Sequence, residues 1–204
     1  MVKTETIGIL SLQGDFLEHE MMIQAINPDY NIIHLNHPDQ IPEVDRLVLP
    51  GGESTTMNRL GGHAIGNTRF FEALKKHLTS RPIPILATCA GMILISQDIQ
   101  SIPERKSLKP ILGLLPIRVL RNNYGRQQLS FEAPLDVTGF DSSFNGVFIR
   151  APVVELLPNT NVEVVAKYQG APVLIRHKNI IASTFHPELT TDQRIHRMFL
   201  GMKN

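Results

Sequence analysis

Residues 83–95 read Ile-Pro-Ile-Leu-Ala-Thr-Cys-Ala-Gly-Met-Ile-Leu-Ile, and they are the strongest indication of the fold class in this sequence. It begins as a short, β-rich apolar run, passes through the small residues around Cys89, and continues as an apolar, helix-like segment over Met92–Ile95. Small residues on both sides of Cys89 suit a nucleophile elbow, because a tight strand-to-helix turn crowds the backbone there. The stretch therefore predicts a buried strand, a sharp turn with Cys89 at its tip, and a helix.

The same alternation of short apolar runs and helical stretches occupies the first half of the chain. Strands are predicted over residues 7–12, 31–35, 46–49 and 83–87, and helices over residues 16–26 and 69–79. Such an order is typical of α/β folds, in which parallel strands are connected by helices that cover the faces of the sheet. We therefore expect a parallel, doubly wound sheet.

The second half of the chain has a different pattern. From Gly113 onward the predicted strands are shorter, and the alternating residues 162–168 and 171–176 indicate antiparallel or mixed pairing. Residues 191–202 have helical spacing and predict a closing helix. We expect an α/β fold with a mostly parallel central sheet flanked by helices and extra antiparallel strands in the second half. Without an internal repeat or a linker, the pattern favours one domain over residues 1–204.

Composition and charge exclude several classes of function. The 204 residues are 42% hydrophobic and 19% charged, which is ordinary for a globular protein. The formal net charge of +1 provides no surplus for binding nucleic acid or an anionic membrane. One cysteine cannot form an intrachain disulfide, and no apolar run reaches the roughly 18 to 20 residues of a membrane span. With no signal-peptide pattern at the start, the sequence predicts a soluble, cytoplasmic protein.

Cys89 is a candidate nucleophile. At a helix N-terminus, unpaired N–H groups lower the pKa of a thiol and can hold a developing oxyanion. Acyl transfer to a thiolate also needs a base that protonates the leaving amine and a carboxylate that orients the base. Among eight histidines, His186 stands out because a β-like run precedes it and Glu188 follows two residues later. The alternative, a buried Cys89 that acts only as a small hydrophobe, stays open on these residues alone.

The other seven histidines, at positions 19, 34, 37, 63, 77, 177 and 196, lie in polar or mixed contexts. These contexts favour solvated or hydrogen-bonded side chains. His34 and His37 are close enough in sequence to suggest a metal site, but no further Cys or His completes a ligand set nearby. We therefore expect no metal.

The loop Pro50-Gly51-Gly52-Glu53-Ser54-Thr55-Thr56 follows a predicted strand. Paired glycines let a backbone approach a ligand closely, and their N–H groups can point at an oxyanion. A phosphate cradle is the competing interpretation, but the Gly-Lys-Ser/Thr ending of a P-loop is absent. A turn followed by a Ser/Thr helix cap is a third interpretation, and it is compatible with the first.

The order of these features resembles the class I (triad) glutamine amidotransferases: a Gly-Gly-Glu-Ser loop, a Thr-Cys-Ala-Gly elbow and a distant His-Pro-Glu. Further matches narrow the resemblance to the family of glutaminase subunits of pyridoxal 5′-phosphate synthase. They extend along nearly the whole chain: Leu12-Gln13-Gly14, Glu18-His19, Pro50–Thr56, Arg121-Asn122, Tyr124-Gly125-Arg126-Gln127, Ser130-Phe131, Phe148-Ile149-Arg150-Ala151-Pro152 and Phe185–Thr190. The resemblance implies the three-layer, flavodoxin-like fold of that class.

Position by position, the resemblance implies that Cys89 is the nucleophile, His186 the base and Glu188 its orienting acid. Gly52 and Ala90 would supply oxyanion N–H groups. The residues implied in glutamine binding are Gly52, Glu53, Ser54, Arg121, Ile149 and Arg150. An arginine can bind the substrate α-carboxylate, while backbone groups and an acid can bind its α-ammonium group. Which group binds which end of glutamine stays open.

The reaction that the resemblance implies is hydrolysis of L-glutamine to L-glutamate and ammonia through a γ-glutamyl thioester. Ammonia would pass through a channel to a separate, barrel-shaped synthase subunit of the PdxS type in a hetero-oligomer, and the free glutaminase would be poorly active. We expect no pyridoxal phosphate, metal or nucleotide on this chain, and no nucleic-acid or membrane partner.

Ala87 is the one visible departure, because elbows of this family usually begin with glycine. The added methyl group is tolerable if residue 87 keeps a negative φ, and it would strain the turn if a positive φ were required. Two alternatives therefore accompany the glutaminase interpretation. One is another cysteine hydrolase on a similar sheet, such as a γ-glutamyl hydrolase or an amidotransferase that serves a different synthase. The other is a catalytically silent partner that regulates the synthase.

Overall fold

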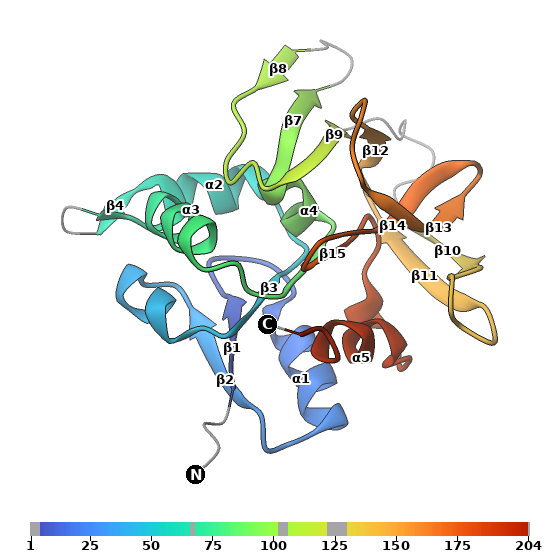
Figure 1. Ribbon diagram of the computed structural model, residues 1–204, viewed down its shortest axis with the longest axis horizontal. Coiled ribbons are helices and arrows are strands. Elements are labelled where there is room, and N and C mark those ends of the chain that lie inside the picture. The colour runs from blue at the N-terminus through green and yellow to red at the C-terminus, as the bar shows by residue number, and fades with distance from the viewer. Residues whose placement is uncertain (1–4, 66–67, 102–105, 122–129, 204) are drawn as a thin grey trace.

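A seven-stranded sheet forms the centre of the fold (Figure 1), in a computed structural model that describes residues 5–65, 68–101, 106–121 and 130–203. The strand order is β13-β14-β15-β6-β3-β1-β2. Neighbouring strands pair in parallel from β15 to β2, namely β15 (Ile180–Ser183), β6 (Ile85–Thr88), β3 (Arg46–Leu49), β1 (Thr6–Leu10) and β2 (Asn31–Leu35). At the other end of the sheet, β14 (Ala171–His177) pairs antiparallel with β15, and the edge strand β13 (Glu163–Tyr168) pairs antiparallel with β14.

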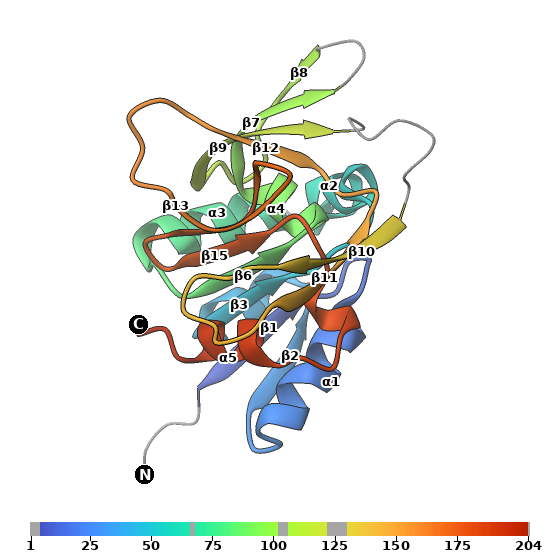
Figure 2. The same ribbon diagram turned by 90° about the vertical axis from the view of Figure 1, so that its right-hand side faces the viewer.

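Helices cover both faces of this sheet. Figure 2 shows α1 (Phe16–Ile26) and α5 (Arg194–Leu200) on one side, and α2 (Ser54–Gly62), α3 (Phe70–Ser80) and α4 (Ala90–Ile95) on the other. Successive residues of a strand point to opposite faces, so each strand contributes to two cores. In β3, Val48 belongs to the core that contains Phe199 of α5, whereas Leu47 and Leu49 belong to the core that contains Phe70 of α3. The result is the predicted three-layer α/β fold.

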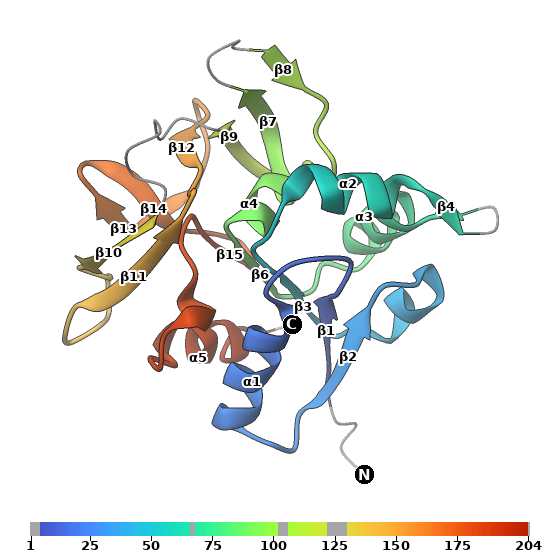
Figure 3. The same cartoon turned by 180° about the vertical axis from the view of Figure 1, so that it is seen from behind.

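A second, four-stranded sheet lies beyond α4 and extends away from the central sheet (Figure 3). Its strand order is β12-β9-β7-β8, with bounds Val153–Leu156, Leu115–Arg121, Ser96–Ser101 and Lys106–Leu108. Two antiparallel pairs complete the strands: β10 (Ser130–Leu135) with β11 (Phe144–Ile149), and β4 (Ala64–Ile65) with β5 (Thr68–Arg69). The extra strands are confirmed, but those of the second sheet begin at Ser96 rather than at the predicted Gly113, because β7 follows α4 directly, and the β4-β5 pair lies earlier still.

The predicted elements of the first half agree closely with the observed ones. Residues 16–26, 31–35 and 46–49 match α1, β2 and β3 in full, and the other strands and helices differ by one to three residues at an end. Two short 3-10 helices were not predicted, η1 (Pro38–Glu43) and η2 (Pro187–Leu189). Of the helices in the described ranges, none has both the length and the apolar character to cross a membrane.

Candidate active site

Cys89 occupies a strained position between β6 and α4. Its φ of 44° and ψ of −103° lie in a region that residues with a side chain rarely adopt, and such backbone conformations cost about 1 to 3 kcal/mol each. The surroundings enforce this conformation: Cys89 N donates to Ser183 O at 2.8 Å, and a Cβ on Gly91 would collide with the Leu49 carbonyl. Ala87 is an ordinary residue of β6, and the positive φ falls on Cys89 instead. The methyl group of Ala87 therefore causes no strain.

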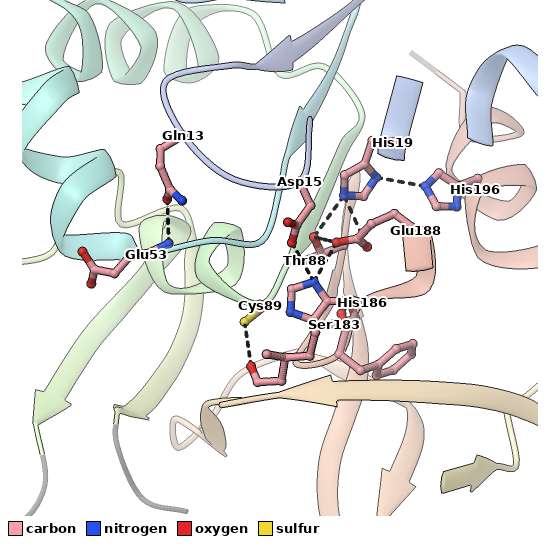
Figure 4. A network of polar contacts seen from close by, with 12 residues as sticks. Gln13, Asp15, His19, Glu53, Thr88, Cys89, Ser183, His186, Glu188 and His196 are labelled. Carbon is pink, nitrogen blue, oxygen red and sulfur yellow. Dashed lines mark hydrogen bonds and ion pairs between the residues drawn. The ribbon is translucent and has the colours of Figure 1, made fainter. Parts of the chain in front are cut away.

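The sheet brings His186 to the elbow. Strands β15 and β6 are parallel neighbours, with Ser183 opposite Thr88, so the residues that follow both strands emerge at the same edge. His186 N donates to Val147 O of β11 at 2.9 Å, which fixes the backbone of His186. Its Nε2 atom has no hydrogen-bond partner among the described residues and faces the sulfur of Cys89 (Figure 4). The thiol itself donates to Ile149 O at 3.9 Å.

Glu188 orients the imidazole from the other side. Its Oε1 lies 2.8 Å from Nδ1 of His186, and the carboxylate is fully buried. Burial opposes the charge of His186, but the neighbouring Asp15, Cys89 and Glu188 outweigh it and raise the pKa of His186 to about 12. Burial likewise opposes the charge of Glu188, yet the neighbouring His19, followed by His186, lowers the pKa of Glu188 well below its ordinary value. A thiol, an imidazole and a carboxylate are thus aligned as acyl transfer requires.

Asp15 is a residue of this site that the sequence interpretation missed. It immediately precedes α1, and its Oδ2 lies 3.1 Å from Nδ1 of His186. Asp15, His186 and Glu188 also bring three potential metal-ligand atoms within 4.8 Å of one another. A metal would need an unprotonated Nδ1, whereas two carboxylates at this atom favour a proton on it. The arrangement suits an oriented base better than a metal centre.

A buried pair of histidines continues the network behind Glu188. Nδ1 of His19 lies 3.0 Å from Nε2 of His196, and Nε2 of His19 lies 3.1 Å from Oγ1 of Thr88 and 3.4 Å from Oε2 of Glu188 (Figure 4). Both histidines are hydrogen-bonded, as predicted, but neither is exposed to solvent. The pair suggested as a metal site is used otherwise: His34 pairs with Glu20 at 2.7 Å, and His37 caps η1.

A cavity of about 280 Å³ opens beside Cys89 and His186. All the residues implied in glutamine binding line it, namely Gly52, Glu53, Ser54, Arg121, Ile149 and Arg150. Gln13, Asp15, Ile93 and Pro152 complete the wall. Arg150 is exposed, has a φ of 44°, and forms no ion pair with any described residue. The matching residues Asn122 and Tyr124–Gln127 lie outside the described part of the chain.

Glu53 has a structural task in addition to its place in the cavity. Its carboxylate accepts hydrogen bonds from Thr55 N at 3.0 Å and Thr56 N at 2.6 Å, so it caps α2. The predicted Ser/Thr cap is therefore wrong, because a glutamate one residue earlier reaches the free N–H groups of the first turn. Partial burial opposes its charge, but these hydrogen bonds lower the pKa of Glu53 to about 2. Arg121 donates to Thr55 Oγ1 at 3.0 Å and to Glu53 at 3.5 Å.

Comparison with known proteins agrees with this geometry. Residues 9–204 match the SNO glutamine amidotransferase family. A pyridoxal 5′-phosphate synthase subunit PdxT from Thermosipho africanus is 44% identical, over 96% of this chain and 97% of the relative. A crystal structure of a glutamine amidotransferase has 38% identity and a TM-score of 0.80, covering 95% of this chain and 96% of that one. The glutaminase domain of CTPS from Trypanosoma brucei, solved with bound acivicin, shares the fold at 13% identity, with a TM-score of 0.59 and coverage of 94% and 89%.

Proposed function

Because the chain belongs to the SNO glutamine amidotransferase family, we propose that it hydrolyses the side-chain amide of L-glutamine with Cys89, His186 and Glu188. One observation carries the assignment of residues: Nε2 of His186 faces the Cys89 sulfur while Nδ1 lies 2.8 Å from Glu188, at the wall of a cavity. An unpartnered ring nitrogen beside a thiol is suited to transfer protons between the nucleophile and the leaving group.

The reaction follows from these positions. The sulfur of Cys89 attacks the amide carbon, and the carbonyl oxygen becomes an oxyanion that the N–H groups of Gly52 and Ala90 would stabilise. His186, as the imidazolium, donates the Nε2 proton to the departing ammonia and leaves a γ-glutamyl thioester. The neutral imidazole then takes a proton from water, which attacks the thioester and releases glutamate and the thiol. Glu188 keeps the imidazole ring oriented through both steps.

The cavity has the charges that an amino acid needs. Arg150 forms no ion pair with a described residue and is available for the α-carboxylate, while Arg121 and Glu53, 3.5 Å apart, place a second cation and a carboxylate on the cavity wall. Depression of the pKa of Glu53 to about 2 keeps it ionised at neutral pH. The small residues Gly52 and Ser54 leave room for substrate next to the elbow.

The identity of the proposed partner is inferred from relatives that are named as subunits of pyridoxal 5′-phosphate synthase. We infer that this chain delivers ammonia to a PdxS-type synthase subunit in a hetero-oligomer, where the nitrogen enters pyridoxal 5′-phosphate. A single glutamine amidotransferase domain over residues 1–204 and a cytoplasmic location are part of the same proposal.

Ammonia release from glutamine, measured with and without the synthase subunit, tests the proposal. We expect glutaminase activity in the mixture, one equivalent of label at Cys89 from a glutamine analogue with an electrophilic side chain, and no activity in Cys89→Ala. Wild-type activity in Cys89→Ala would refute the mechanism. Turnover of γ-glutamyl peptides instead of glutamine would indicate another cysteine hydrolase, and a complex without any turnover would indicate a silent regulator.

A further inference from the structure

His19 is a buried polar residue that the proposed reaction does not use. It lies on α1, its side chain is fully buried, and it does not line the cavity. It does contact two residues next to the chemistry, because its Nε2 lies 3.1 Å from Oγ1 of Thr88 and 3.4 Å from Oε2 of Glu188. Thr88 directly precedes the nucleophile in the chain.

Resting on the proposed function, we propose that His19 is a positioning residue of the triad. It would hold Glu188 from the side opposite His186, while His196 fixes the direction in which His19 donates. The second oxygen of Glu188 carries this argument: Oε2 is buried and has no hydrogen-bond partner among the described residues, so the nearby N–H of His19 is the group available to compensate its charge. An uncompensated buried carboxylate oxygen is costly, and it would leave the orientation of Glu188 poorly fixed.

The proton positions on His19 support this role. Nδ1 of His19 faces Nε2 of His196 at 3.0 Å, so one of these two nitrogens donates and the other accepts. If His196 donates, neutral His19 carries its proton on Nε2. The opposite arrangement would aim the lone pair of Nε2 at the negatively charged Glu188, 3.4 Å away, so the charge of Glu188 disfavours it. The favoured arrangement therefore places an N–H on Nε2 that points toward Thr88 and Glu188.

His196 is suited to be the neutral member of the pair. Burial first, and then the neighbouring His19, lowers the pKa of His196 to about 3, although Glu188 acts in the opposite direction. His196 lies on α5, so the chain of contacts runs from α5 through α1 to η2 and reaches the triad from behind. Thr88 completes it, since its hydroxyl accepts from His19 and donates to Oε1 of Glu188 at 3.4 Å.

The experiment compares His19→Leu with His19→Gln in the complex with the synthase subunit. Leucine removes the donor, whereas glutamine keeps an N–H group that can reach Glu188. We expect His19→Leu to lower kcat for ammonia release about ten- to a hundredfold, the effect of losing a hydrogen bond to a charged group, with the KM for glutamine little changed. His19→Gln should recover most of kcat, His196→Leu should show a smaller loss than His19→Leu, and the exposed His63→Gln should match the wild type.

A measurement on the wild type keeps the proposal testable if His19→Leu fails to fold. The ¹⁵N chemical shifts of the His19 ring should show a protonated Nε2 at neutral pH, and an unprotonated Nε2 would overturn the proposal. A folded His19→Leu with wild-type kcat, or equal losses in the leucine and glutamine variants, would also overturn it. The failure of the proposed function is distinguishable, because the wild-type complex itself would then release no ammonia.

Discussion

Oδ2 of Asp15 lies 3.1 Å from Nδ1 of His186, so the proposed base has a second carboxylate in addition to Glu188. Nδ1 carries at most one proton, which two acceptors therefore share. The two carboxylates differ in their surroundings: the Glu188 side chain is fully buried, whereas that of Asp15 is 34% exposed. Asp15 raises the pKa of His186 and provides a second acceptor for the same N–H.

The first prediction is that Asp15→Asn lowers the pKa of His186, because an amide cannot stabilise the imidazolium by charge. Nuclear magnetic resonance titration of the His186 ring measures the shift directly in the free chain. The exposed Asp29 offers a matched control, since Asp29→Asn removes the same charge far from the site. A His186 titration that is identical in the wild type and Asp15→Asn would show that the contact has no energetic effect.

The second prediction compares the proposed base, His186, with the acid that orients it, Glu188. His186→Asn should reduce kcat by roughly 10²- to 10⁴-fold, the usual contribution of a proton-transferring group. Glu188→Gln should reduce kcat less, because Asp15 still accepts a hydrogen bond from Nδ1–H of His186. This contact keeps Nδ1 protonated and leaves Nε2 free to exchange a proton with the reacting groups. The double variant Asp15→Asn/Glu188→Gln should therefore lose more than the two single losses combined. Small and equal effects of His186→Asn and Glu188→Gln would remove both residues from the mechanism.

Local sequence patterns were sufficient to predict the elbow and the central parallel strands. The turn around Cys89 is encoded by neighbouring residues, since an apolar run, small flanking residues and a second apolar run follow one another directly. The second sheet was placed too late because β7 begins immediately after α4, without a turn residue to mark the change. β7 is stabilised as a strand by its antiparallel pairing with β8 and its parallel pairing with β9, which the pattern of β7 itself does not encode.

The residues behind the triad could not be found in this way. Asp15 directly precedes α1 and His19 lies within it, and the hydrophobic pattern of this helix indicates only which face packs against the sheet. The two side chains reach His186 and Glu188 because α1 lies against η2. Polar contacts between elements so distant in sequence depend on how the elements pack, which local periodicity does not encode. The His-Pro-Glu motif was recognisable because its two functional side chains are only two residues apart.

The third prediction concerns Arg150. Arg150→Ala should raise the KM for glutamine about ten- to a hundredfold, as expected for the loss of a hydrogen bond to a charged group. The rate at which a small, uncharged alkylating agent modifies Cys89 should stay unchanged. Because alanine and arginine tolerate the observed φ of 44° about equally, the backbone is not a confounding factor. Arg150→Lys should be intermediate, since it keeps the charge without the planar guanidinium. An unchanged KM in Arg150→Ala would show that Arg150 does not bind glutamine and is only an exposed side chain of a loop.

The fourth prediction is a pH dependence of stability. The pKa of Glu53 is lowered from 4.5 to about 2 in the folded chain, so its contribution is complete above about pH 4.5 and is lost as the pH falls toward 2. At pH 7, Glu53→Gln should reduce the free energy of unfolding by about 0.5 to 1 kcal/mol, a small value for a helix cap because the carboxylate is partly exposed.

Urea unfolding of both chains without glutamine checks this sign. The difference between wild type and Glu53→Gln should stay constant from pH 7 to about pH 4.5 and then shrink as the pH is lowered further to 3. Glu43→Gln serves as a control, because Glu43 is an exposed carboxylate at the end of η1. A difference that stays constant below pH 4.5 as well would show that the charge of Glu53 does not stabilise α2.

The last prediction concerns control by the synthase subunit, and its physical basis is the peptide between Gly51 and Gly52. The Gly51 carbonyl accepts a hydrogen bond from Asp15 N at 3.3 Å, and Glu53 N donates to Oε1 of Gln13 at 2.7 Å, so residues 13–15 hold this peptide in its present orientation. Gly52 has a φ of 142°, which residues with a side chain rarely adopt. A partner that contacts residues 13–18 or the loop after Gly52 can therefore reorient the proposed oxyanion donor.

We expect the free chain to hydrolyse glutamine slowly and to become much faster when the synthase subunit binds. The partner can stabilise the active peptide orientation only by its difference in affinity for the two states, so activation should saturate with the added subunit. Gly52→Ala should abolish the activation, because its Cβ would lie 2.6 Å from Oε1 of Gln13 and 2.9 Å from Cα of Gly14. Steady-state ammonia release, titrated with the synthase subunit, measures both effects. A full rate without any partner would rule out this form of control and would place the oxyanion donors in their active orientation from the start.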